Sequence, residues 1–158
     1  MSLERPALER RIVAGLDAGR IPVLLGGCGT GRTSLLRRLA ARFAPAAQYI
    51  DLAAVASTPE RCLAAIAAAT PFSAITATPA PGTATAEAAM AHLFDGLDRA
   101  RGPAGEPATF LIDEFLDLRT FENFPGLRRV IADGIARWAA SPNRFVLASR
   151  FTSRAHRV

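Results

Sequence analysis

The stretch LLGGCGTGRTSLLRRLA, residues 24–40, decides the fold. It begins in a short apolar run, passes through four glycines, and ends in a segment whose leucines recur at helical spacing. The pattern Gly-x-x-x-x-Gly-Lys-Ser/Thr describes a loop that holds phosphate between a strand and a helix. Gly26, Gly31 and Thr33 satisfy this pattern, but residue 32 is arginine instead of lysine. The stretch therefore predicts a phosphate-binding loop with one substituted residue.

The glycines of such a loop let the backbone turn tightly and direct its N–H groups inward. These donors and the positive end of the following helix hold the phosphates of a nucleotide. Thr33 is expected to bind Mg²⁺ through its hydroxyl, and Ser34 to contact the α-phosphate. The alternative is a glycine-rich turn that binds no ligand. The predicted nucleotide-binding residues are Gly26, Gly27, Cys28, Gly29, Thr30, Gly31, Arg32, Thr33 and Ser34.

Length and composition predict one domain over residues 1–158, since a chain of this length can bury a sizeable core. No apolar run is long enough to cross a membrane, and residues 1–11 lack the apolar stretch of a secretory signal. A cytoplasmic location is the expectation. Cys28 and Cys62 have no cysteine or histidine at metal-ligand spacing, so both are interpreted as free thiols.

All 19 basic residues are arginine, and the formal net charge is +5. Two interpretations are open. An excess of positive charge suits an anionic partner such as DNA. The arginines are scattered along the chain, however, which favours an ordinary solvated surface. The absence of lysine also indicates a GC-rich codon bias, which offers one explanation for Arg32.

Helices and strands are predicted to alternate along the chain. This alternation, with strands that are near-continuous apolar runs, predicts an α/β fold: a three-layer α/β/α sandwich with a parallel sheet of about four strands. Residues 70–85, rich in Thr, Ala and Pro, are expected to form an exposed, mobile connection. Strands are predicted at 21–26 (buried), 47–52, 108–113 and 144–149, and helices at 6–18, 32–43, 59–69 (capped by Ser57 or Thr58), 86–101 and 125–140.

Two of these strands end in polar residues. FLIDE, residues 110–114, ends in Asp113 and Glu114, and a charged pair at the end of a buried strand is costly unless it has partners or a role. Asp113 is expected to hold Mg²⁺ through water, and Glu114 to polarise an attacking water as general base. VLASR, residues 146–150, ends in Ser149 and Arg150 at the same edge of a parallel sheet, where a polar group can sense the γ-phosphate. The alternatives are an acidic turn, an ordinary strand end and a solvated charge.

Together, GGCGTGRTSLL, FLIDEF and FVLASR resemble the nucleotide-binding core of the AAA+ ATPases and their relatives, the STAND ATPases. In those families the segments are the Walker A loop, the Walker B strand and sensor 1. The resemblance covers about residues 12–150 and implies the P-loop NTPase fold, with ATP and Mg²⁺ as ligands. It implies ATP over GTP because the chain has no Asn-Lys-x-Asp guanine motif. The catalytic residues that it implies are Arg32, Glu114, Ser149 and Arg150.

Two departures from the families matter. Arg32 replaces their lysine, and the planar guanidinium is strongly attracted to phosphate but harder to place in a narrow loop. Binding is therefore expected to survive better than turnover, and Arg32→Lys is expected to raise kcat. The families also add a fifth core strand and a helical lid with an arginine finger, and neither is recognised here. The domain is expected to be incomplete at its C-terminus, with strand 21–26 as an open edge.

Three functions remain open on the sequence. The first is an ATP-binding domain that hydrolyses slowly or only in an assembly. The second is a nucleotide switch or protein-interaction module, and the third a DNA-associated ATPase resembling origin-recognition or transposition helpers. The corresponding partners are ATP, a second copy or a protein client, and DNA. Phenylalanines 115, 121 and 124 suit core packing or contact with a lid, a neighbouring subunit or a client. Trp138 is expected in the core, and His92 and His156 have no assigned role.

Overall fold

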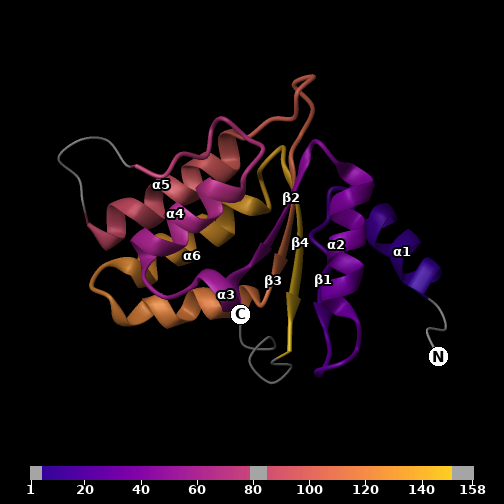
Figure 1. Ribbon diagram of the computed structural model, residues 1–158, viewed down its shortest axis with the longest axis horizontal. Helices are drawn as coiled ribbons and strands as arrows, with labels where there is room; N and C mark the ends of the chain where they lie inside the picture. Colours follow the sequence, from indigo (N-terminus) through magenta and orange to yellow (C-terminus); the bar gives the residue numbers. More distant parts are fainter. Residues whose placement is uncertain (1–4, 79–84, 151–158) are drawn as a thin grey trace.

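The computed structural model describes residues 5–78 and 85–150 of the chain. It is an α/β fold, as predicted, with a four-stranded parallel sheet between helices (Figure 1). The strands are β1 (Val23–Leu25), β2 (Ala47–Asp51), β3 (Thr109–Asp113) and β4 (Arg144–Ser149). The helices are α1 (Arg5–Asp17), α2 (Arg32–Phe43), α3 (Leu52–Val55), α4 (Pro59–Ala69), α5 (Ala86–Arg99), the 3₁₀ helix η1 (Phe115–Asn123) and α6 (Leu127–Trp138).

The strand order is β1-β4-β3-β2, and all three pairings are parallel. β3 and β4 are therefore central, while β1 and β2 form the two edges. Because all strands run the same way, their carboxyl ends lie at one edge of the sheet, the lower end in Figure 1. In α/β sheets this edge is where ligands bind.

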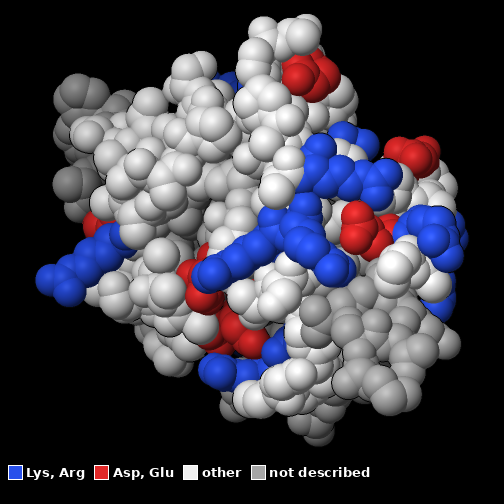
Figure 2. Space-filling view, turned by 45° about the vertical axis from the view of Figure 1, so that its right-hand side comes forward, with Lys and Arg blue, Asp and Glu red and all other residues white. Residues whose placement is uncertain are grey.

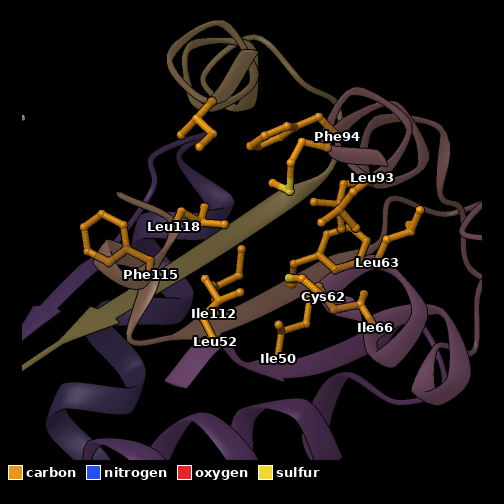
Figure 3. Close-up of a cluster of buried hydrophobic side chains, with 14 of the residues drawn as sticks. Ile50, Leu52, Cys62, Leu63, Ile66, Leu93, Phe94, Ile112, Phe115 and Leu118 are labelled. Atoms are coloured by element: carbon orange, nitrogen blue, oxygen red, sulfur yellow. The ribbon is translucent and has the colours of Figure 1, made fainter. Parts of the chain in front are cut away.

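Helices cover both faces of the sheet, so the fold has three layers. α1 and α2 lie on one side, and α4, α5 and α6 on the other (Figure 1). β3 alternates between these layers: Leu111 belongs to the smaller core cluster with α1 and α2, whereas Phe110 and Ile112 belong to the larger one. Figure 3 shows side chains from β2, β3, α3, α4, α5 and η1 meeting in the larger cluster.

Capping residues start two of the helices where the sequence indicates. The Thr58 hydroxyl accepts a hydrogen bond from the Arg61 N–H at the start of α4, which settles the predicted choice between Ser57 and Thr58. Thr85 caps α5 in the same way through the Ala88 N–H. The expected core position of Trp138 is confirmed, because its ring is 2% exposed and stacks on Phe145 at 4.8 Å between centroids.

The predicted burial of strand 21–26 is wrong. The strand is only three residues long, and Val23 and Leu25 are 49% and 38% exposed. The physical reason is its place in the sheet: β1 pairs with β4 on one side and has no strand on its other side among the described residues.

The prediction of an exposed connection over residues 70–85 is also wrong in part. Phe72 and Ile75 are buried in the larger core cluster, and the Phe72 ring lies edge-on to Phe110 at 5.3 Å. Two apolar side chains thus pull the first part of this segment onto the core. The rest of the prediction includes residues 79–84, which lie outside the described residues.

Both cysteines are free thiols, as predicted, with Cys28 exposed and Cys62 buried. The His92 Nε2 lies 2.8 Å from the Thr76 Oγ1, and His156 lies outside the described residues. Over residues 5–78 and 85–150, no helix combines the length and the apolar character needed to span a membrane.

Candidate functional site

The three segments singled out in the sequence meet at the carboxyl edge of the sheet. The register places Leu25 of β1 beside Ser149 of β4, and the Gly26 N–H donates to the Ser149 carbonyl oxygen over 3.3 Å. β4 in turn lies beside β3, which ends at Asp113. The glycine loop, the acidic pair and the end of β4 are therefore neighbours in space, as the parallel sheet predicts.

The glycine loop turns directly into α2. Gly29 and Gly31 have φ angles of 77° and 76°, in the left-handed region that glycine adopts without a Cβ penalty. The Thr30 hydroxyl donates to the Gly27 carbonyl oxygen over 2.9 Å and closes the turn. The loop encloses a hollow of about 350 Å³ at the start of α2. Its lining residues are Gly27, Gly29, Thr30, Gly31, Arg32, Thr33 and Ser34.

Two residues of the predicted nucleotide-binding set, Gly26 and Cys28, are not among those that line this hollow. Gly26 belongs to the turn itself, since a Cβ there would lie 3.1 Å from the Thr30 hydroxyl oxygen. Cys28 is exposed. The hollow is thus lined by seven of the nine predicted residues.

The Asp113 carboxylate joins the loop to the sheet. Its Oδ2 accepts a hydrogen bond of 2.6 Å from the Thr33 hydroxyl and a second of 3.1 Å from the Tyr49 hydroxyl. Its Oδ1 accepts one from the Glu114 backbone N–H over 3.1 Å. Asp113 is only 3% exposed, so these three donors are what satisfies a buried negative charge.

Tyr49 is the site residue that the sequence did not reveal. It lies in β2, paired in register with Leu111, and alternation places Leu111 and Asp113 on one face of β3. Once β2 is known to adjoin β3, Tyr49 must therefore point to the same layer as Asp113. The sequence contains this alternation, but it does not say which strands are neighbours.

Burial, followed by the nearby Asp113 and Asp51 carboxylates, raises the pKa of Tyr49 to about 12. All three effects oppose ionisation of the phenol, because the phenolate would lose hydration and face two negative charges. Tyr49 therefore stays protonated at neutral pH and remains a hydrogen-bond donor to Asp113.

Glu114 contacts the loop through Arg32. The Arg32 Nη2 lies 3.2 Å from the Glu114 Oε1, and the two side chains are only 12% and 10% exposed. The other carboxylate oxygen, Oε2, accepts a hydrogen bond of 3.2 Å from the Arg150 backbone N–H, and the Arg150 Nε lies 3.9 Å away. Glu114 is thus held between the loop after β1 and the end of β4.

The backbone of Glu114 has φ 53° and ψ 43°, the one left-handed non-glycine residue in the described part of the chain. Such a conformation costs about 1–3 kcal/mol for a residue with a side chain. It ends the strand alternation that would send neighbouring side chains to opposite faces. As a result, Asp113 and Glu114 both reach residues at the start of α2.

The donors and acceptors of this site fit a magnesium-bound polyphosphate. Mg²⁺ prefers oxygen ligands, which the Thr33 hydroxyl and the Asp113 carboxylate supply. The Arg32 Nε and Nη1 are buried and have no hydrogen-bond partner among the described residues. A buried donor without a partner costs about 1–3 kcal/mol, and an anion in the adjoining hollow would satisfy both.

Ser149 and Arg150 end β4 beside this group. The Ser149 side chain is fully buried, whereas Arg150 is exposed and contributes its backbone N–H to Glu114. All four residues predicted as catalytic, Arg32, Glu114, Ser149 and Arg150, thus lie at one edge of the sheet.

The phenylalanines after Glu114 divide between core and surface. Phe115 and Phe121 are buried in the core cluster, whereas Phe124 is 37% exposed. η1 and α6 also enclose an apolar groove of about 350 Å³. Its lining residues are Phe115, Leu116, Leu118, Arg119, Glu122, Arg128, Ile131, Ala132, Ile135 and Ala136.

Arginine side chains gather on the face that carries α1 and α2, with acidic side chains among them (Figure 2). Glu9 of α1 pairs with Arg42 at 3.1 Å and with Arg38 at 3.8 Å, both from α2. Arg10 and Arg11 of α1 are exposed on their helix. This face is therefore basic but partly neutralised.

No protein-family model matches the chain. None of the curated proteins compared with it matches its sequence either.

Proposed function

We propose that the chain is an ATP-binding domain of the P-loop type, similar to AAA+ and STAND ATPases, which hydrolyses ATP in the presence of Mg²⁺. The main support for this proposal is the 2.6 Å hydrogen bond that the Thr33 hydroxyl donates to Asp113. It joins residues 80 positions apart and places an oxygen pair suited to Mg²⁺ beside a hollow lined by glycine backbone.

Each residue has a distinct part in this proposal. The N–H groups of the loop and the Arg32 guanidinium bind the phosphates. Thr33 and Asp113 hold Mg²⁺, which when bound neutralises charge on the phosphate oxygens. Glu114 accepts a proton from the attacking water, and Ser149 and Arg150 are assigned to the γ-phosphate.

A second candidate is a nucleotide-controlled binding module that does not hydrolyse. The observation that favours it is that both oxygens of Glu114 are engaged by arginine groups, so the proposed base is occupied. A third candidate, a DNA-associated ATPase, draws on the arginine-rich face of α1 and α2. Binding to DNA that weakens steeply with added salt would favour the third.

Steady-state ATPase activity separates the first two candidates. The parent is expected to release phosphate from ATP only with Mg²⁺, and Glu114→Gln to retain ATP binding while losing release. Glu122→Gln is the matched control, because it removes the same charge from an ion pair with Arg119 that lies on η1. If Glu114→Gln hydrolyses ATP as fast as the parent and the control, Glu114 is not the base.

A further inference from the structure

We propose that Arg32 and Glu114 form a latch: Arg32 holds the general base while the loop is free of triphosphate, and releases it when it binds the phosphates. This inference rests on the proposed function and adds its regulation. The name "latch" refers below to the Arg32–Glu114 ion pair alone.

The geometry places one guanidinium between two sites. Arg32 lines the hollow of the loop, and its Nη2 contacts the Glu114 Oε1 at 3.2 Å. The stem of Arg32 runs past Gly26, where a Cβ would meet its Cδ at 3.6 Å. The arginine thus crosses the loop to reach the carboxylate, and both side chains are about nine-tenths buried.

The latch uses only one of the three guanidinium nitrogens of Arg32. Its Nε and Nη1 are buried without a partner among residues 5–78 and 85–150. A guanidinium pairs most strongly when two of its N–H groups meet two oxygens, and a phosphate group presents such a pair. The single contact with Glu114 is therefore the weaker arrangement, and a triphosphate in the hollow competes for the same group.

The same contact prevents Glu114 from acting as the general base. A carboxylate that is paired with Arg32 on one oxygen and hydrogen-bonded to the Arg150 N–H on the other is poorly placed to accept a proton from water. Transfer of Arg32 to phosphate frees the Oε1. Binding of the triphosphate thereby frees the base. Molecules with a closed latch must first release Arg32, so they lower the apparent affinity of the protein for nucleotide.

The test is a binding measurement with the non-hydrolysable β,γ-imido analogue of ATP and Mg²⁺. Glu114→Gln opens the latch without removing Arg32. If the latch is closed in nine molecules of ten, this variant binds about tenfold more tightly than the parent. Asp51→Asn is the matched control, because Asp51 ends β2 in register with Asp113 and carries a charge at the same edge of the sheet. It is expected to leave the affinity nearly unchanged.

Comparison in an Arg32→Ala background separates the latch from simple charge repulsion. There Glu114→Gln is expected to have no effect, because no arginine remains to be released. The latch is overturned if Glu114→Gln raises the affinity for the analogue equally with and without Arg32, or if it does not raise the affinity when Arg32 is present. Either result leaves the proposed function unaffected. A parent that does not bind the analogue at millimolar concentration overturns both.

A second measurement decides the matter if Arg32→Ala binds too weakly to titrate. In the nucleotide-free proteins, the melting-temperature shifts of Arg32→Ala, Glu114→Gln and the double variant form a cycle. If the latch is closed, the melting temperature of the double variant falls by less than the sum of the two single shifts. Additive shifts overturn it.

Discussion

Tyr49 shares one oxygen of Asp113 with Thr33, the residue proposed to bind Mg²⁺. We interpret Tyr49 as a positioning residue, because its hydroxyl fixes the carboxylate without lying in the loop. Tyr49→Phe removes this hydrogen bond and keeps the ring, which packs beneath the Arg37 guanidinium at 5.1 Å.

Tyr49→Phe is expected to lower the free energy of unfolding by roughly 1.5–3 kcal/mol, since a hydrogen bond to a buried carboxylate is lost. It is also expected to reduce the gain in ATP affinity that Mg²⁺ provides, while leaving the affinity without Mg²⁺ unchanged. Titrations with ATP in EDTA and in Mg²⁺ check both parts. An unaltered Mg²⁺ gain would show that Tyr49 has only a structural role.

Cys62 makes stability depend on pH. Burial raises the pKa of this thiol from 9.0 to about 12, because a thiolate in the apolar core loses its hydration. The unfolded chain therefore releases the thiol proton first as the pH rises. The stability that the buried neutral thiol contributes is fully present below pH 9 and is lost between pH 9 and 12.

Between pH 8 and 10.5 the thiol is expected to remove about 2 kcal/mol of stability. Cys62→Ala is expected to be less stable than the parent at pH 8, because it leaves a small cavity, but to lose less on going to pH 10.5. Urea denaturation at the two pH values measures the difference. Cys28→Ala, which changes an exposed thiol, provides the control and is expected to follow the parent.

Among single residues, sequence patterns identify those that belong to a motif and miss those that do not. Thr33 and Asp113 each occupy a defined position in a recognisable motif. A parallel sheet brings these two motifs to the same edge, so the contact between the two residues can be predicted. Tyr49 belongs to no motif, and its role depends on β2 being the neighbour of β3. The pairing of Arg32 with Glu114 depends on the left-handed turn at Glu114, which its residue type does not favour.

Among the elements, α5 and α6 pack closely because α6 carries a glycine at the contact. A Cβ added to Gly134 would lie 2.5 Å from the ring of Phe94. That ring is 2% exposed and lies against Trp138 at 5.7 Å between centroids, so it has little freedom to move. Close packing thus outweighs the poor helix propensity of glycine.

Gly134→Ala is expected to destabilise the protein by roughly 1–3 kcal/mol through overpacking, although alanine is favoured in an isolated helix by about 1 kcal/mol. Gly15→Ala in α1 is the matched control, since its Cβ would meet only the Pro22 Cγ at 3.3 Å. Chemical denaturation compares the two variants with the parent. A more stable Gly134→Ala variant would contradict the packing described here.

The longer elements follow from periodicity and capping, and the short ones do not. α2, α4 and α5 have apolar faces and clear starts, and their bounds agree closely with the predictions. α3 and η1 were not predicted, because a four-residue helix and a 3₁₀ helix have no repeat long enough to recognise. The burial of β1 depends on its neighbours, which its own apolar sequence does not specify.

Over the whole molecule, the exposed edge of β1 is a feature open to association with a second chain. Within the described residues β1 pairs only with β4, and its outer backbone edge has no strand partner. Val23 and Leu25 add partly exposed apolar surface beside this edge. Edge strands of this kind pair readily with a second chain.

We therefore expect the 158-residue chain to self-associate as its concentration rises. Val23→Arg places a charge on β1 and is expected to shift the association to higher concentration. Sedimentation velocity over a range of concentrations checks both expectations. A parent that sediments as a monomer at every concentration would show that the edge is protected.

We propose that the loop at residues 26–34 and the carboxylate of Asp113 together bind ATP with Mg²⁺. The most direct measurement is the ATP affinity of the parent and of Asp113→Ala, each with and without Mg²⁺. The parent is expected to bind ATP more tightly with Mg²⁺, because a metal ion held by Thr33 and Asp113 would neutralise phosphate charge, and Asp113→Ala is expected to lose that gain. A parent that does not bind ATP, or whose ATP affinity is the same with and without Mg²⁺, would contradict binding of Mg²⁺ and ATP at this site.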